Sequence, residues 1–176
     1  MSTAGGTNLL GALVVALGDR VDASITRSSG LARNDAIALS ALLHFLEAPR
    51  IDRIADVLGL TSSGTVRLVD RLEAAGLVRR SAGNDSRATA VALTATGRRT
   101  AQAVTDARAA ALDGALDALS PAERRTFTAL AGTVVAGLVA PERVHPWICR
   151  LCDTDGCGRP EGRCPVANAA QELFST

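Results

Sequence analysis

Four cysteines near the carboxyl end carry the clearest potential for chemistry in this sequence. They are Cys149, Cys152, Cys157 and Cys164, spaced C-x2-C-x4-C-x6-C, and the chain has no other cysteine. Glycine and proline residues interrupt the segment, so it can fold as a loop around one centre. Clustered thiols in a cytosolic protein usually bind metal, because disulfides are rare there. The spacing therefore predicts a metal centre with four cysteine ligands.

Two kinds of metal centre suit four thiolates, and the sequence leaves both open. Cys-x2-Cys is a common first half of a structural zinc site, whose four ligands form a tetrahedron. The first three positions also resemble a zinc knuckle, although the third ligand is Cys157 and not histidine. An iron–sulfur cluster is the alternative, because Cys164 precedes Pro165 as in ferredoxin-type motifs, but the remaining spacing differs from the ferredoxin run. Redox thiols without metal are a third interpretation.

Residues around the cysteines have predicted supporting roles. His145 precedes Pro146 and is expected at the surface, and Trp147 is expected to pack this tail against the helices. The basic side chains that can offset a negatively charged centre are Arg143, Arg150, Arg159 and Arg163. A zinc site would mainly brace the tail, whereas an iron–sulfur cluster could sense oxidants or iron and so change the affinity of the protein for a partner.

A helix-turn-helix pattern occupies residues 54–76. Apolar residues from Ile54 to Leu58 form one face of a short helix, and Gly59 ends it because glycine costs about 1 kcal/mol in a helix interior. Thr61 is a suitable N-cap for a second helix, which Gly76 closes. The predicted buried face of this second helix consists of Val66, Val69 and Leu72. Its other face is predicted to contact the major groove of DNA through Ser62, Ser63, Thr65 and Arg67.

A basic β-hairpin is predicted directly after these helices. Residues 77–81 read as a strand, Asn84 and Asp85 lie in a polar turn, and residues 87–93 read as the returning strand. Arginines at the tip can reach phosphates or a narrow minor groove. The predicted hairpin carries Arg79, Arg80 and Arg87.

The order of helix, turn, helix and hairpin resembles the MarR family of bacterial transcriptional regulators. The residues that carry this resemblance run from Leu72-Glu73 through Gly76-Leu77-Val78-Arg79-Arg80 and Asp85-Ser86-Arg87-Ala88 to Val91-Ala92-Leu93-Thr94-Ala95-Thr96-Gly97. The resemblance covers most of residues 8–140 and implies a winged helix-turn-helix that binds double-stranded DNA. It also implies that Arg87 enters the minor groove and that Asp85 holds it. Arg79 and Arg80 are expected to touch phosphates or to support the wing, and Arg71 either pairs with an acid or reaches the DNA backbone.

Helices that flank the winged unit are predicted to form a dimer. Apolar residues from Leu10 to Ile25 make a stripe along a first helix that Gly30 ends, and residues 34–47 form a second helix that Pro49 stops. A long helix runs from Thr94 to about residue 118, and Ser120 begins a capping box for a last helix to about residue 140. The apolar surface of these flanking helices exceeds what one wing can cover, so a second copy is expected to pair with it.

Composition supports this organisation. The 176-residue chain is 47% hydrophobic and 2% aromatic, and its net charge is only +1, which excludes general polyanion binding. Residues 50–99 nevertheless hold nine arginines against five acids, so positive charge concentrates in the winged unit. The predicted divisions are an N-terminal dimerisation helix (1–30), a DNA-binding domain (31–97), C-terminal dimerisation helices (98–141) and a metal-binding tail (142–176). The fold class is mainly α with a small β-hairpin wing.

The sequence predicts a homodimeric transcriptional regulator, expected to be a repressor, that binds a palindromic operator in the cytoplasm. Neither a signal peptide nor an apolar run long enough for a membrane span is visible. No nucleotide-binding loop or catalytic Ser/His/Asp arrangement is present, which argues against an enzyme, and a winged helix that binds protein is the other alternative. The family resemblance also implies a small-molecule effector in a cleft, here near His44, Phe45, Leu13 and Leu17.

Overall fold

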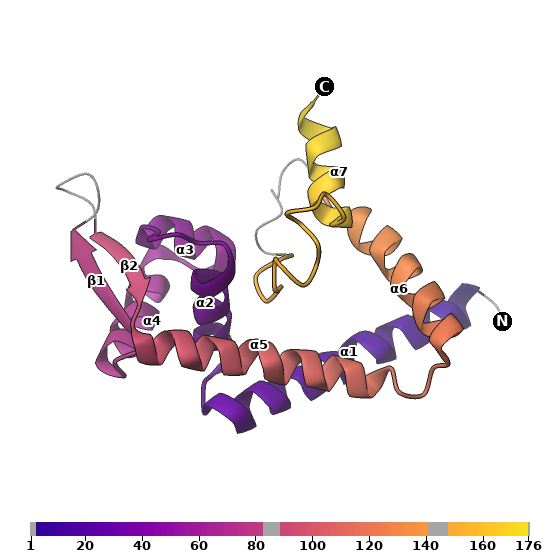
Figure 1. The fold of residues 1–176 in the computed structure, drawn as a ribbon, viewed down its shortest axis with the longest axis horizontal. Helices are drawn as coiled ribbons and strands as arrows, with labels where there is room; N and C mark the ends of the chain where they lie inside the picture. The colour runs from indigo at the N-terminus through magenta and orange to yellow at the C-terminus, as the bar shows by residue number, and fades with distance from the viewer. Residues whose placement is uncertain (1–2, 83–88, 141–147, 176) are drawn as a thin grey trace.

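The computed structural model describes residues 3–82, 89–140 and 148–175, which form a mainly helical structure with one two-stranded hairpin (Figure 1). The elements are α1 (Thr3–Ser29), α2 (Arg33–His44), α3 (Ile51–Leu58), α4 (Ser62–Ala74), β1 (Val78–Ala82), β2 (Thr89–Leu93), α5 (Ala95–Ala115), α6 (Pro121–Ala136) and α7 (Pro165–Phe174). This order confirms the predicted fold class, a mainly α protein with a hairpin wing.

Two long helices, α1 and α5, form the central part of the structure. α1 and α5 lie side by side, with the winged unit at one end and α6 at the other (Figure 1). Arg20 Nε of α1 donates to the carbonyl oxygen of Ala111 at 3.0 Å, and Ser24 Oγ donates to that of Ala107 at 3.1 Å. Ile25 and Val104 are buried between the helices. These contacts attach the N-terminal helix to the start of the C-terminal helical region.

The core of the winged unit is built from aliphatic side chains of α2, α3, α4 and the hairpin. Its largest buried members are Leu39, Ile54, Val57, Leu68, Val69, Leu72, Val78 and Val91. Scarce aromatic residues leave branched aliphatics to fill the space between elements, where close packing of many small contacts stabilises the fold. This core holds α4 and the hairpin in fixed positions.

Contacts with neighbouring segments fix the position of the hairpin. β1 and β2 pair antiparallel from Val78 opposite Leu93 to Ala82 opposite Thr89. Val91 N donates to the carbonyl oxygen of Pro49 at 2.9 Å, so the segment before α3 runs beside β2. A Cβ atom on Gly97 would lie 1.8 Å from the carbonyl oxygen of Leu77, which shows how closely α5 approaches the start of β1.

Most predicted helix ends are confirmed. Gly59 and Gly76 adopt left-handed backbone angles, with φ of 66° and 69°. Thr61 Oγ1 accepts from Gly64 N, and Ser120 and Glu123 form the expected capping box.

Other boundaries differ from the predictions. α2 ends at His44, three residues early, because Phe45 leaves helical geometry and Leu46 N turns back to bond the carbonyl oxygen of Ala41. α6 ends at Ala136 and not near residue 140. The sequence interpretation missed α7, which begins directly after the last cysteine with Pro165 in its first turn.

Apolar side chains remain exposed on the flanking helices of this single chain. They are Leu9, Leu10, Leu13, Val14 and Val15 on α1, Leu130 and Val134 on α6, and Leu138 just after α6. In the monomer α6 buries none of its residues. Within the described part of the chain, no helix has the length and apolar character needed to cross a membrane.

Candidate DNA-binding face and cysteine module

The exposed face of α4 carries a mixture of small polar, apolar and basic side chains. Thr61 caps the helix, and Ser62, Ser63 and Arg67 are exposed as predicted. Arg67 is in no ion pair among the described residues. These side chains project from an element whose opposite face is buried in the core, which is the arrangement that groove-reading helices require.

One predicted DNA contact is wrong, and one exposed residue was missed. Thr65 is fully buried, and its Oγ1 donates to the carbonyl oxygen of Thr61 at 3.0 Å, so it supports the start of α4 and cannot face DNA. Val66, predicted to be buried, is 38% exposed. The buried stripe is Thr65, Leu68, Val69 and Leu72, which follows the i, i+3, i+4, i+7 rule; the prediction omitted Leu68 and so rotated the helix.

Two predicted DNA-contacting arginines are held in ion pairs. Arg71 donates through Nη2 to Asp35 Oδ1 at 2.7 Å, which joins α4 to the first turn of α2. Arg80 of β1 reaches back to α4, where it pairs with Asp70 at 2.6 Å and with Glu73. Both arginines therefore have structural roles, as the alternatives for them in the sequence interpretation allowed.

The ion pairs of Arg80 shift the pKa values of Glu73 and of Arg80 itself. The pKa of Glu73 is lowered because the backbone N–H and the guanidinium of Arg80 both donate to its carboxylate. The pKa of Arg80 is raised, mainly by its hydrogen bond to Asp70. The wing is thus attached to the recognition helix by charge-assisted bonds.

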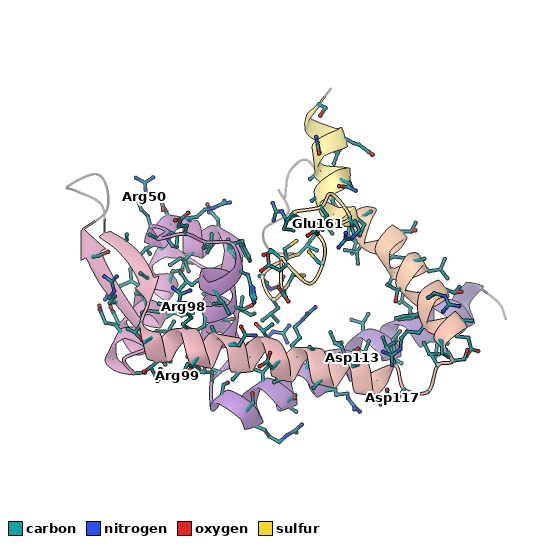
Figure 2. All side chains as sticks on the ribbon, viewed as in Figure 1. Arg50, Arg98, Arg99, Asp113, Asp117 and Glu161 are labelled. Carbon is teal, nitrogen blue, oxygen red and sulfur yellow. The ribbon has the colours of Figure 1, made fainter. Side chains whose placement is uncertain are left out.

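The remaining predicted wing contacts are placed only in part. Arg79 is exposed on β1 beside Arg80. Asp85 and Arg87 fall outside the described residues, as do Arg143, His145 and Trp147. Figure 2 shows arginines such as Arg50, Arg98 and Arg99 on the winged half and the acids Asp113 and Asp117 at the far end of α5. Among these labelled residues, the arginines lie on the half of the molecule that carries α4 and the two aspartates lie away from it.

The four cysteines gather in one small apolar cluster beside α7. Cys149 and Cys164 are buried, Cys152 and Cys157 are half-buried, and all four thiols are free. Within the residues that the structure describes, no three His, Cys, Asp or Glu side chains are positioned as a closed metal site. The cysteines are thus brought together, but the predicted metal centre stays a prediction.

Contacts between the thiols explain their pKa shifts. The Cys149 thiol donates to Cys152, and this bond together with burial raises the pKa of Cys149. The same bond lowers the pKa of Cys152 to about 6, with a smaller contribution from the positive charge of Arg108 on α5. The pKa of Cys157 is raised, chiefly by burial. Of the cysteines with shifted pKa values, Cys152 is therefore the one most readily ionised. The sequence analysis did not identify Arg108 as a neighbour of Cys152 because the two residues are far apart along the chain.

Nearby arginines take different positions relative to this cluster. The positive charge of Arg159 acts on Cys149 and lowers its pKa slightly, against the larger effects that raise it. Arg163 pairs with Glu161 at 3.3 Å. Burial lowers the pKa of Arg150.

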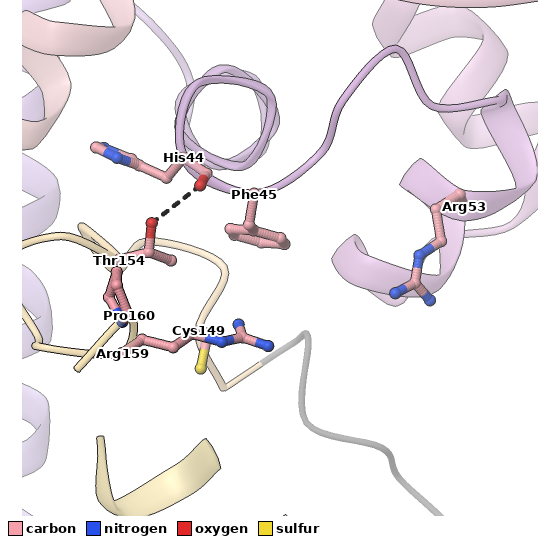
Figure 3. A pocket seen from close by; sticks show the side chains of 7 residues that line it. All are labelled: His44, Phe45, Arg53, Cys149, Thr154, Arg159 and Pro160. Carbon is pink, nitrogen blue, oxygen red and sulfur yellow. Dashed lines mark hydrogen bonds between the residues drawn. The ribbon is translucent and has the colours of Figure 1, made fainter. Parts of the chain in front are cut away.

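The cysteine module, defined here as residues 148–164, docks against the winged unit. Thr154 Oγ1 donates to the carbonyl oxygen of His44 at 2.9 Å, and an Asp153 carboxylate oxygen lies 3.6 Å from His44 Nδ1. A cavity of about 500 Å³ lies between this module and α2 and α3 (Figure 3). Its described lining residues are His44, Phe45, Arg53, Cys149, Thr154, Arg159 and Pro160. His44 and Phe45, expected near an effector cleft, line this cavity, whereas Leu13 and Leu17, expected with them, are not among these lining residues.

The fold and the exposed α4 define a winged helix-turn-helix protein. Residues 29–88 match the model of the MarR family, so this segment is similar to the domain that defines that family. Members of this family are transcription regulators and not enzymes. No curated protein matches the sequence.

Solved structures with the same fold cover most of this chain. Rv1404 from Mycobacterium tuberculosis is 27% identical over 79% of this chain and 97% of its own, with a TM-score of 0.67. MepR from Staphylococcus aureus, a transcription regulator of the multidrug efflux pump MepA, is 18% identical over 76% and 98%, with a TM-score of 0.65. Sco3205 from Streptomyces coelicolor, a MarR-family transcriptional regulator in complex with DNA, is 24% identical over 84% and 96%, with a TM-score of 0.61.

Proposed function

We propose that this protein is a sequence-specific DNA-binding transcriptional regulator. The observation that carries the proposal is α4, whose exposed face presents Ser62, Ser63, Val66 and Arg67 while its other face is buried. Hydroxyl and guanidinium groups can bond base edges and phosphates, and an exposed valine can contact a thymine methyl group. The DNA complex of Sco3205, which shares the fold, supports this function.

The proposed functional unit is a homodimer on a palindromic operator. The exposed leucines and valines of α1 and α6 make an apolar surface that a monomer would leave in water. A two-fold pair of recognition helices reads two half-sites about one DNA turn apart, which increases both affinity and specificity. A dimer bound across a promoter would exclude the polymerase, so repression is the proposed outcome.

The test starts with selection of binding sites from a random pool of double-stranded DNA. We expect an inverted repeat to emerge and its affinity to fall steeply with salt, with a log–log slope of about −0.9 for each phosphate contacted. A reporter gene behind the selected site should be repressed when the protein is expressed. Recovery of no common sequence, together with binding that salt hardly changes, would favour a protein-binding winged helix instead.

The second proposal is that the four cysteines bind one metal centre. Its support is that residues spread over 16 positions fold into one cluster that contains all four thiols, none of them in a disulfide. Thiolates suit both zinc and iron–sulfur clusters. The centre would hold α7 and the module together, because binding energy at such sites is also folding energy.

Elemental analysis and the absorption spectrum of protein purified without oxygen would identify which metal, if any, the four cysteines bind. Elemental analysis with about one zinc per chain and a colourless sample would identify a structural zinc site. Several irons per chain with a brown colour would identify an iron–sulfur cluster and a regulator that senses iron or oxidants. Absence of both metals would reject the centre and leave redox thiols.

A further inference from the structure

The loop between the second and third cysteines is the point where the cysteine module meets the winged unit. Thr154 Oγ1 donates to the carbonyl oxygen of His44, 110 residues away in the sequence, at 2.9 Å (Figure 3). Asp153 places a carboxylate oxygen 3.6 Å from Nδ1 of the same histidine. We call Asp153 and Thr154 the latch. Because His44 is the last residue of α2, the latch satisfies one of the carbonyl groups that a helix end leaves unpaired.

The conformation of the latch depends on the cysteines on either side of it. Asp153 and Thr154 lie between Cys152 and Cys157, and Cys157 N donates to the carbonyl oxygen of Asp153 at 3.1 Å. Leu151, directly before Cys152, packs into the apolar cluster formed by α1, α2 and α5. Release of Cys152 or Cys157 from a common centre would therefore loosen the latch as well.

α2 connects the latch with the recognition helix. At the C-terminal end of α2, the His44 ring shares a 2.8 Å hydrogen bond with Thr105 of α5. In its first turn, Asp35 accepts the bond from Arg71 of α4. The residues between are almost entirely buried, so α2 behaves as a rigid element. α2 therefore provides a continuous physical connection between the latch and α4.

We propose that the latch couples the state of the cysteine centre to DNA affinity. With the centre intact, the docked module holds α2 and keeps α4 in its DNA-reading position; loss of the centre frees the latch and lowers affinity. This inference rests on the proposed DNA binding and on the proposed metal centre. It adds that the signal passes within one chain, through His44, and does not require rearrangement of the dimer helices.

The experiment compares full-length protein with Thr154→Val and Thr154→Ser, each measured on the selected DNA before and after metal removal by a chelator. Valine keeps the shape of threonine but removes the hydroxyl donor, whereas serine keeps the donor. Coupling free energies between sites commonly correspond to about 5- to 150-fold changes in affinity, so the parent should lose at least about fivefold on metal removal. Thr154→Ser should behave as the parent does. Thr154→Val should bind weakly with metal present and lose little more on chelation.

Metal content and melting temperature are measured in parallel, so that a loss of metal or of folding is not mistaken for a loss of coupling. A Thr154→Val protein that keeps its metal and still shows the full response of the parent would overturn the latch. A parent that binds DNA but holds no metal, or does not respond to its removal, would also overturn it while DNA binding stands. A parent that binds no DNA would reject the proposed function itself. If Thr154→Val fails to fold, Asp153→Asn replaces it, with the same two outcomes.

Discussion

Arg67 is the arginine of α4 that remains available for DNA, because the neighbouring arginines have partners within the protein. Arg71 bonds Asp35, and Arg80 bonds Asp70 and Glu73. Arg67 is exposed and in no ion pair among the described residues. Charge alone does not distinguish these side chains, whereas the position of their acidic partners does. Arg67 is therefore the first residue whose removal should reveal how α4 reads DNA.

Replacement of Arg67 by alanine should weaken DNA binding without a loss of stability. A base-edge contact would cost about 1–3 kcal/mol and relax specificity, and a phosphate contact would make the salt slope shallower by about one. Fluorescence anisotropy at several salt concentrations separates these two cases. Arg125→Ala removes an exposed arginine of α6 as the control and should have little effect. Equal affinity for parent and Arg67→Ala would remove Arg67 from the interface.

At the scale of elements, the attachment of the wing to α4 should depend on pH. The pKa of Glu73 lies below its ordinary value of 4.5, because Arg80 donates to its ionised form. A carboxyl group with a lowered folded pKa stabilises the protein above its unfolded pKa, and this stability is lost as pH falls through the folded value. The ion pair between Glu73 and Arg80 is thus expected to weaken in acid.

Glu73→Gln tests this pH dependence. The variant should melt at a lower temperature than the parent at pH 7, and the difference should disappear as the pH falls below 4.5, the ordinary value for Glu73. Glu47→Gln changes an exposed glutamate of the loop after α2 and serves as the control, with no expected difference. Thermal unfolding by circular dichroism across this pH range provides the measurement. A constant difference at every pH would mean that glutamine disturbs packing and not charge.

The junction between β1 and α5 should tolerate no side chain at Gly97. A methyl group there would meet the carbonyl oxygen of Leu77 at 1.8 Å, so the strand and the helix would have to separate. We expect Gly97→Ala to destabilise the protein by about 4 kcal/mol or more, the size that marks a serious backbone conflict. Gly18→Ala, in a helical position with open space, should instead stabilise by about 0.5–1 kcal/mol. Urea unfolding of both variants measures the contrast.

At the scale of the whole molecule, the exposed apolar surface of α1 and α6 lies far from α4, at the opposite end of the two long helices (Figure 1). Pairing of two chains through this surface would set the distance between their winged units, because α5 runs from one region to the other. Dimerisation and DNA recognition are therefore expected to be linked by rigid helices.

Val14→Glu should break this dimer. Val14 is 63% exposed in the single chain, and a charge placed in an apolar interface has no partner there. Light scattering should show monomers, and binding to the palindromic site should weaken strongly. Ala23→Glu places the same charge on the opposite face of α1 and should leave the dimer intact. A dimeric Val14→Glu protein would locate the interface elsewhere.

Local patterns made the helices α1 to α6, the hairpin and most helix ends predictable from the sequence, whereas α7 was missed. Gly59, Thr61, Gly76 and Ser120 act on residues within a few positions, so their effects can be read along the chain. The spacing of apolar residues was less reliable in α4, where omission of Leu68 placed Thr65 on the wrong face. Single misread positions thus rotate a predicted surface without changing the predicted fold.

The sequence by itself determined the winged helix-turn-helix, the basic half of the molecule and the presence of four clustered cysteines, because each depends on neighbouring residues. Only the tertiary structure decided which arginines are engaged, that the charge of Arg108 acts on Cys152, and that Thr154 docks on His44. These contacts join residues that are far apart in the chain, and no local pattern encodes which distant groups meet. They arise when packing of the aliphatic core brings separate elements together.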